Sequence, residues 1–405
     1  MPDSFETPVA VLIYNRPDKT ARILERLSQV QPRRLLVVAD GPNPAKPDDA
    51  EKTARTRALF DSLPWDCEVQ REFSDTNLGC KRRVSSGIDW VFRQVEEAIL
   101  IEDDILAEPS FFEFCREMLA RYRDDERIGT ITGCNFQNRR KRGPYSYYFS
   151  IFPHIWGWAT WRRVWKRYDV DMKLWPEIRA SGLLLDLLQD EAATAHWVKE
   201  FDRGYEGRID TWDIQLLLSC WQHSQLTITP EVNLTCNIGF GAEATHTRHA
   251  HHIHADIPTR PMEFPLRHPP YMMPDFEAAS WTFLPDGWMP EQAILRRERY
   301  RTGRSGIAGM MPEREADTPA GLVARAEALL RRQDVSNAFY LLTRASAWGQ
   351  PVRDLERLRA VCYFSFNRWQ PGLESLKAEL ARFPDNAEAA QMLHAAAGLL
   401  TQPPA

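Results

Sequence analysis

Three consecutive acidic residues, Glu102, Asp103 and Asp104, follow the apolar run Ala98–Ile101. A buried strand that ends in adjacent carboxylates is costly unless a cation joins them. Mg²⁺ and Mn²⁺ prefer oxygen ligands, usually one or two carboxylates together with water and substrate phosphates. The triplet therefore predicts a divalent metal site. The alternative is an acidic helix cap, because Asp104 stands shortly before Pro109, which is placed to start a helix.

Polar residues also end the neighbouring apolar runs, and this context favours the metal interpretation. Arginine can clamp phosphate, and aspartate can accept hydrogen bonds from a base or a ribose. If the strand pleat continues, Glu102 and Asp104 face one side and Asp103 the other, so one acid can hold metal while its neighbour reaches a ribose hydroxyl. The four polar strand ends are, in chain order, Asn15–Arg16, Asp40, Asp75–Asn77 and Glu102–Asp104.

The elements that must position these residues alternate between short apolar runs and helical stretches. Such alternation predicts an α/β fold with a mostly parallel sheet and helices on both faces. Ligands of such sheets bind at the carboxyl ends of the strands, where the polar residues stand. The expected strands are 9–14, 35–39, 67–73, 98–101 and 128–132, and the expected helices 20–30, 50–63, 81–94 and 109–122. Helices are also expected near 192–202 and 213–221, and strands around 226–229 and 232–237.

The C-terminal part, from Pro319 to about Leu400, is helical in pattern throughout. A shift of 34 positions aligns Val335 with Trp369 and Leu342 with Leu376, and this period is that of tetratricopeptide repeats. The alternative is a helical bundle with chance self-similarity. The expected domains are residues 1–255 for the α/β part, 256–318 for a Pro-rich irregular wrap or linker, and 319–405 for a helical tetratricopeptide-like domain.

Composition narrows the class of protein. The 405 residues carry a formal net charge of −5, too mild for a dedicated nucleic-acid binder. No apolar run approaches the roughly 18–20 residues that a transmembrane helix needs, and the N-terminus lacks the pattern of a leader. The seven cysteines include no CxxC pair, as expected of free thiols in a reducing compartment. These features predict a soluble, cytoplasmic protein.

Residues 8 to about 247 resemble a GT-A glycosyltransferase, a nucleotide-sugar-dependent enzyme with a Rossmann-like sheet and a DxD-type metal motif. They are most similar to N-acetylglucosaminyltransferase I and to bacterial family-2-like proteins, some of them described as hemolytic proteins. The ordered series of motifs is more specific than any one of them. The segments that carry the resemblance are VLIYNRP (11–17), VVADGP (37–42), NLGCKRRVSSGIDWVF (77–92), ILIEDDILAEPSFFEFC (99–115), FPHIWGWATWRRVW (152–165), TWDIQ (211–215) and PEVNLTCNIGFGAEATHT (230–247).

The resemblance implies roles for individual residues. It assigns Arg16 to the nucleotide diphosphate or base, Asp40 to the base, Asp103 to the ribose and Asp104 to the metal that bridges the diphosphate. Asp213 of TWDIQ falls where the family has its catalytic base, and Asp210 is the reserve because the family segment has adjacent acids. One departure is the stretch Ser85–Gly87, where the eukaryotic enzyme has a nucleotide-contacting histidine.

Five further features have both a functional and a structural interpretation. His246, beside flexible glycines, stands where many GT-A enzymes place a histidine against the metal or diphosphate; it is otherwise a surface-loop histidine. Asn77 and Gly79 serve the donor loop or make the turn before the next helix. The histidines at 249, 251, 252 and 254 favour a solvated loop over a zinc site, and the basic run 139–142 likewise favours a solvated loop. The tryptophans at 156, 158, 161 and 165 fit a sugar-stacking pocket, although the last three also have helical core spacing.

These observations together predict a Mn²⁺- or Mg²⁺-dependent glycosyltransferase that takes a nucleoside-diphosphate sugar, by an inverting mechanism, with a retaining mechanism as the alternative. The acceptor is a glycan, a lipid-linked sugar or a protein, and the helical tail recruits a protein partner. Neither a nucleic-acid partner nor a transmembrane segment is expected. Two alternatives stay open. One is a sugar nucleotidyltransferase, although that class usually opens with a glycine-rich phosphate loop that VLIYNRPDKT lacks. The other is a non-catalytic scaffold on a degenerate transferase core.

Overall fold

The computed structural model describes residues 5–137, 140–239, 257–281, 295, 298 and 318–400. The chain divides into two compact units, residues 1–275 and residues 276–405. His246 and the histidines at 249–254 lie outside the described residues, as does Arg139 at the start of the basic run.

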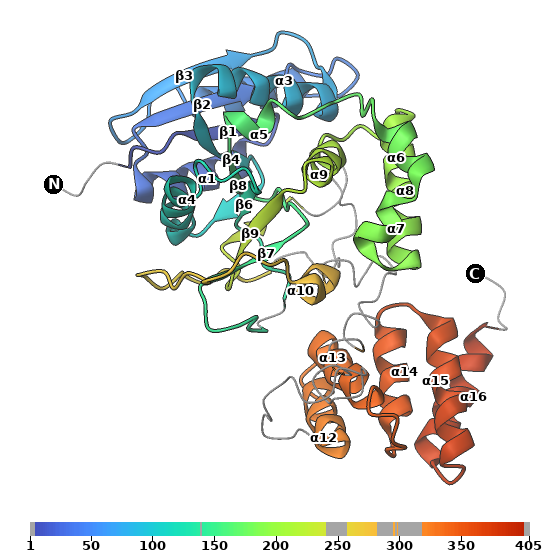
Figure 1. Ribbon diagram of the computed structural model, residues 1–405. Coiled ribbons are helices and arrows are strands. Elements are labelled where there is room, and N and C mark those ends of the chain that lie inside the picture. The colour runs from blue at the N-terminus through green and yellow to red at the C-terminus, as the bar shows by residue number, and fades with distance from the viewer. Residues whose placement is uncertain are drawn as a thin grey trace. The chain divides into compact units, whose positions relative to one another are not determined.

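An eight-stranded sheet forms the centre of the first unit (Figure 1). The parallel group β3-β2-β1-β4 is followed by β8, which is antiparallel to both of its neighbours, and then by the parallel pair β6 and β9 and the antiparallel edge strand β7. The predicted mostly parallel sheet is therefore confirmed. In sheet order the strands are β3 (Glu68–Phe73), β2 (Arg34–Ala39), β1 (Val9–Ile13), β4 (Glu97–Glu102), β8 (Trp158–Trp161), β6 (Ile128–Thr132), β9 (Leu226–Pro230) and β7 (Tyr147–Ser150).

Helices pack on both faces of this sheet, as the sequence predicts. Side chains of a strand alternate between the two faces, so Val9 and Val11 of β1 join one apolar core while Ala10 and Leu12 join another. The first core includes residues of α1 (Pro17–Val30) and α4 (Pro109–Arg121), and α2 (Asp49–Ala58) contacts α1. The second core includes residues of α3 (Gly79–Gln94) and α9 (Asp213–Gln222).

The tryptophan-rich segment differs from its predicted helical register. Trp158 and Trp161 begin and end strand β8, and Trp165 ends the short helix α5 (Arg162–Trp165). All three side chains are buried, so the core interpretation is confirmed for them although the element type is wrong for the first two. The remaining elements of the unit are β5 (Ile105–Ala107), which pairs with β10 (Thr235–Asn237), and the helices α6 (Trp175–Ser181), α7 (Leu183–Leu188) and α8 (Glu191–Tyr205).

Residues 257–275, within the predicted linker, belong to the first unit. The backbone N–H of Ser146 donates to the carbonyl of Arg267 (2.9 Å), and the N–H of Arg267 donates back to Ser146 Oγ (2.9 Å). Phe149 of the edge strand β7 also forms a bridge with Pro274. Because this segment pairs with the sheet edge, the boundary between the units falls at 275/276 rather than at 255/256.

The second unit is helical where the structure describes it; helices were predicted for residues 319–405, whereas α10 lies within the predicted irregular linker. Helices α13 and α15 begin 34 residues apart, at Val335 and Trp369, which matches the shift found in the sequence. An apolar core around Phe339 and Leu342 joins α12, α13 and α14. The helices are α10 (Phe276–Trp281), α12 (Pro319–Leu330), α13 (Val335–Ser346), α14 (Leu355–Ser365), α15 (Trp369–Arg382) and α16 (Ala387–Leu400).

All seven cysteines lie within the described ranges, and all are free thiols. Among the helices of the described ranges, none combines the length and the apolar character needed to cross a membrane.

Candidate functional site

The site begins where the strand order reverses. From β1 the chain passes through β2 to β3 at one edge, and then returns to β4 on the other side of β1. Leu12 of β1 pairs in register with Glu102 of β4. The segments that follow these two residues therefore leave the sheet side by side, at the position where open α/β sheets bind their ligands.

Arg16 joins the two segments. Its Nη1 donates to Asp103 Oδ1 (2.9 Å) and to Asp104 Oδ2 (2.6 Å), and the backbone N–H of Tyr14 donates to Asp103 Oδ2 (2.9 Å). Strand β4 ends at Glu102, so the next two acids lie in a turn. Both acids consequently face the same guanidinium, whereas a continued pleat would have separated them.

The charges at this edge perturb one another strongly. Burial, followed by the charges of Asp104, Asp103 and Asp213, raises the pKa of Glu102 well above its usual range. Burial also raises the pKa of Asp103, although Arg16 opposes the shift. Burial alone would lower the pKa of Arg16, but the neighbouring acids outweigh it and raise that pKa. The charge of Asp213, the first residue of α9, is thus among those that act on Glu102.

The helix-cap alternative for Asp104 is wrong. Strand β5 separates the triplet from α4, and Glu108 caps that helix by accepting a hydrogen bond from the N–H of Ser110 (2.8 Å). Asp104 instead contacts the chain that follows β10: its carbonyl accepts from the N–H of Ile238 (2.8 Å). A Cβ on Gly239 would lie 2.1 Å from Asp104 Oδ2, so only glycine allows this close approach.

Two other predicted site residues, Asp40 and Asp210, bind the N-terminus of α3. Asp40 Oδ1 accepts from the N–H groups of Gly41 (2.8 Å) and Leu78 (2.9 Å), and its Oδ2 accepts from the N–H of Gly79 (3.1 Å) and from Asn77 Nδ2 (3.0 Å). Asp210 accepts from the N–H groups of the next two residues of α3, 2.9 Å in each case. The two carboxylates together take up the backbone donors that a helix N-terminus leaves unpaired.

Asp40 and Asn77 are also committed to the protein itself. Four donors fill the hydrogen-bonding capacity of the Asp40 carboxylate, and burial raises its pKa. Asn77 Nδ2 donates to the Gly41 carbonyl (2.9 Å) as well as to Asp40. These contacts hold the loop before α3 against the carboxyl end of β2.

Asp213, the first residue of α9, differs from Asp210. Its Oδ1 accepts from Thr211 Oγ1 and from the N–H of Ile214 (3.0 Å), whereas within the described residues its Oδ2 accepts no hydrogen bond. Burial and the charges of Glu102, Asp210 and Asp213 raise the pKa of the Cys80 thiol far above its ordinary value. The Cys80 side chain is therefore a neutral thiol.

The candidate ligands for a divalent cation at this site are carboxylates of the acidic triplet. No group in the described part of the chain donates a hydrogen bond to the Glu102 carboxylate, and the charges that act on it include three carboxylates against the guanidinium of Arg16. Across the described residues, no three acidic, histidine or cysteine side chains are grouped as a metal site. Two carboxylates nevertheless suffice for Mg²⁺ or Mn²⁺ when phosphates and water complete the shell, so Glu102 and Asp104 fit such a cation.

Sequence reasoning missed Asp49, which supports the site from the start of α2. It accepts from Tyr14 Oη (2.6 Å), from Asn15 Nδ2 and from the N–H of Asn43 (2.6 Å). These bonds fix the segment that carries Arg16. The available signal was the position of Asp49 just before a helical pattern, which marks a helix start but not its partners.

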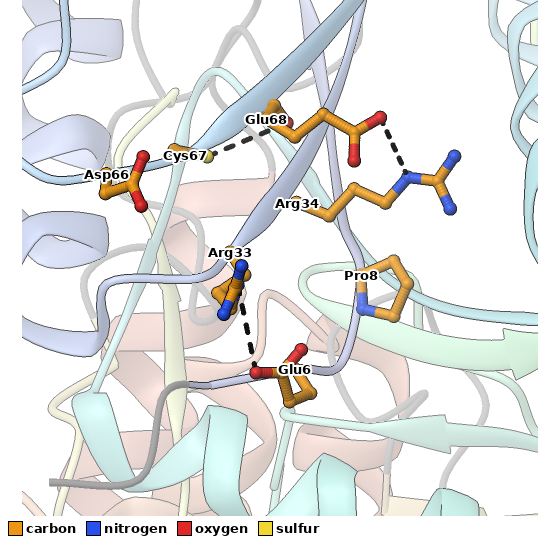
Figure 2. A pocket seen from close by; sticks show the side chains of 7 residues that line it. All are labelled: Glu6, Pro8, Arg33, Arg34, Asp66, Cys67 and Glu68. Carbon is orange, nitrogen blue, oxygen red and sulfur yellow. Dashed lines mark hydrogen bonds and ion pairs between the residues drawn. The ribbon is translucent and has the colours of Figure 1, made fainter.

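A hollow of about 540 Å³ lies at the amino edge of the sheet, where strands β1, β2 and β3 begin (Figure 2). The acidic triplet lies at the carboxyl edge, where the strands end. The charges of the hollow are loosely paired: Arg33 Nε lies 3.9 Å from Glu6 Oε1, and Arg34 Nε lies 3.8 Å from Glu68 Oε1. The hollow collects residues from the amino ends of β1, β2 and β3, away from the acidic triplet. The lining residues are Glu6, Pro8, Arg33, Arg34, Asp66, Cys67 and Glu68.

No family model matches the chain, and no curated protein matches it either.

Proposed function

We propose that the protein is a metal-dependent glycosyltransferase of the GT-A type, which transfers a sugar from a nucleoside-diphosphate sugar to an acceptor hydroxyl. The observation that carries the proposal is the convergence of Arg16, the triplet Glu102–Asp104 and Asp213 at the carboxyl ends of β1 and β4. A cation, adjacent acids and a further carboxylate at the reversal of strand order match the needs of a nucleotide diphosphate and a reacting hydroxyl.

The state of the α3 N-terminus supports a dependence on metal. A helix N-terminus normally offers backbone N–H groups to phosphate, but Asp40 and Asp210 already occupy those of α3. A diphosphate at this edge would be bound by Arg16 together with a divalent cation, which Glu102 and Asp104 would hold. That cation would supply charge stabilisation for the departing diphosphate, and Asp103 serves the ribose.

Asp213 acts as the general base in this proposal. Its Oδ2 accepts the proton of the acceptor hydroxyl while Thr211 and the N–H of Ile214 orient the carboxylate through Oδ1. Such a base contributes roughly 10²–10⁴-fold to the rate. Direct attack of the activated hydroxyl on the anomeric carbon requires no covalent intermediate and gives inversion. The neutral Cys80 thiol fits this scheme, because it offers no competing nucleophile.

The sugar nucleotidyltransferase alternative is less well supported. Only Tyr14, Asn15 and Arg16 separate β1 from α1, and none is a glycine whose bare backbone would let phosphate approach. This short connection favours recognition of the nucleotide by side chains rather than by a glycine-rich loop.

The second unit has a proposed role of its own. Paired helices whose starts repeat after 34 residues are consistent with tetratricopeptide-like repeats, which commonly present a groove to a protein partner. We assign to this unit the recruitment of a protein acceptor or a partner enzyme.

The test is nucleotide release from a panel of nucleotide sugars, with and without Mn²⁺, because transferases slowly hydrolyse their donor without an acceptor. Wild type is compared with Asp104→Asn and with Asp66→Asn, a matched control at the opposite edge of the sheet. We expect metal-dependent release of one nucleotide. Asp104→Asn should lower it at least about a hundredfold, and Asp66→Asn should not change it.

If no nucleotide sugar of the panel released its nucleotide, and a thermal-shift scan showed no metal-dependent nucleotide binding, the transferase proposal would be contradicted. The alternative of a non-catalytic scaffold protein would then be favoured. Release that is equal in wild type and Asp104→Asn would contradict the metal assignment.

A further inference from the structure

Asp210 makes contacts that a general base does not need. Its Oδ2 accepts from the N–H of Cys80 and its Oδ1 from the N–H of Lys81, both at 2.9 Å. Both amides lie in the first turn of α3, where the helix supplies no partner for them. The carboxylate thus ties the chain just before α9 to a helix that stands about 130 residues earlier in the sequence.

Gly79 makes room for this contact. Its φ of +79° lies in the left-handed region that favours glycine. A Cβ at this position would also lie only 2.8 Å from Asp210 Oδ2. The turn before α3 is therefore shaped around the Asp210 carboxylate as well as around Asp40.

The chain from Asp210 to Asp213 is held on its other side by aromatic packing. Trp212 is buried and stacks on Trp158 with ring centroids 5.7 Å apart, and its carbonyl accepts from Tyr168 Oη (3.0 Å). Asp210 is thus the anchor on the α3 side, and Trp212 is the anchor on the core side. Asp213 follows directly, and its Oδ2 accepts no hydrogen bond from the residues that the structure describes.

We infer that Asp210 is a positioning residue that clips the start of α9 onto α3 and thereby holds Asp213 against the acidic triplet. The inference rests on the proposed function, in which Asp213 is the base, and it replaces the reserve role of Asp210 as a base. A carboxylate whose two oxygens already accept backbone hydrogen bonds is poorly placed to take a proton from a substrate.

The test compares Asp210→Asn and Asp210→Ala with Asp213→Asn in the full-length chain, using metal-dependent nucleotide release. Asparagine keeps one side-chain oxygen that can accept from Cys80 or Lys81, whereas alanine keeps none. Asp210→Asn should therefore lower kcat less than Asp210→Ala does, by about three- to tenfold, and leave the acid limb of the pH–rate profile in place. Asp210→Ala should lower kcat about 10- to 100-fold, with little change in the KM of the donor, because the base is misplaced. Asp213→Asn should lower kcat by roughly 10²–10⁴-fold and remove the acid limb.

Either of two results would overturn the inference. Asp210→Asn as inactive as Asp213→Asn, with the acid limb lost, would make Asp210 the base. Asp210→Ala within twofold of wild type would show that the clip is not needed.

A second readout keeps the inference separate from the proposed function. Amide hydrogen exchange at Cys80 and Lys81 should accelerate about tenfold in Asp210→Ala and in Gly79→Ala, and less in Asp210→Asn, which keeps one acceptor oxygen. If wild type releases no nucleotide, the proposed function fails, and unchanged exchange in Asp210→Ala would then refute the clip itself.

Discussion

The carboxyl and amino edges of the central sheet, where the parallel strands end and begin, differ in how their charged residues are buried and paired. At the carboxyl edge, Asp103 is buried and its contacts with Arg16 and with the N–H of Tyr14 are both 2.9 Å long. At the amino edge, the arginines around the hollow of Figure 2 lie 3.8–3.9 Å from carboxylates that are mostly exposed. The described hollow is at the amino edge, whereas the strongly perturbed carboxylates are at the carboxyl edge.

Desolvation rather than open volume distinguishes the two edges. Charges in water interact weakly and are screened, whereas carboxylates removed from water shift their pKa values and need a counter-ion. Strongly perturbed groups in one cluster are typical of functional sites.

The largest contrast in stability is expected from the two arginines. Arg16→Met leaves Asp103 buried without its guanidinium and should lower the free energy of unfolding of the first unit by about 2–4 kcal/mol at pH 7. Arg34→Met, at the amino edge, should change it by less than about 0.5 kcal/mol. Urea-dependent hydrogen exchange of peptides from β1 and β4 measures both. If Arg16→Met and Arg34→Met changed the free energy of unfolding by similarly small amounts, the two edges would not differ in how their charges contribute to stability.

A medium effect with a defined pH dependence is expected for Asp49. Burial alone would raise its pKa, but the hydrogen bonds from Tyr14, Asn43 and Asn15 outweigh it and lower that pKa. The stability that Asp49 contributes is therefore present above its unfolded pKa of about 4 and is lost as the pH falls through the lower folded value. Asp49→Ala should cost about 2–3 kcal/mol at pH 7, and less at pH 3.

The control for this prediction is Glu68→Ala at the amino edge, where the carboxylate is mostly exposed. It should stay within about 0.5 kcal/mol of wild type at both pH values. A loss for Asp49→Ala that is constant from pH 7 to pH 3 would show that its charge is not the stabilising feature.

The smallest expected effect concerns one cysteine at each edge. Burial raises the pKa of Cys67, and burial together with several acids raises that of Cys80 further. Iodoacetamide at pH 8 should alkylate Cys67 at least about ten times faster than Cys80, because the thiolate is the reactive form. Peptide mapping over time separates the two thiols. Glu102→Gln should reduce the difference in alkylation rate between Cys67 and Cys80. If Cys80 of the wild type were alkylated faster than Cys67, the expected effect of the neighbouring acids on Cys80 would be contradicted.

The sequence was sufficient to bring the acidic triplet and Arg16 together. Alternating apolar runs and helices predict parallel strands, and the carboxyl ends of parallel strands meet at one edge whatever the details of the loops. The in-register pairing of Leu12 with Glu102 agrees with that reasoning. Local patterns fix such features because each depends on a few neighbouring residues.

The partners of Asp40 and Asp210 could not be predicted in the same way. Most donors to Asp40 lie 37 to 39 positions away in the sequence, and those to Asp210 lie 129 and 130 positions away. The prediction for the tryptophan-rich segment was wrong for another reason. Strand β8 has only four residues, and over so short a stretch a helical and an extended periodicity are hard to tell apart. Asp103 and Asp104 were assigned to opposite sides because the end of β4 at Glu102 was not visible in the pattern.

The double capping of α3 also has a consequence for how the chain assembles. The first turn of this helix is completed by Asp210, a residue synthesised about 130 positions later. During translation the early strands can pair and bury their apolar faces well before that residue emerges from the ribosome. The N–H groups of Cys80 and Lys81 therefore gain their acceptor only after residue 210 has been synthesised.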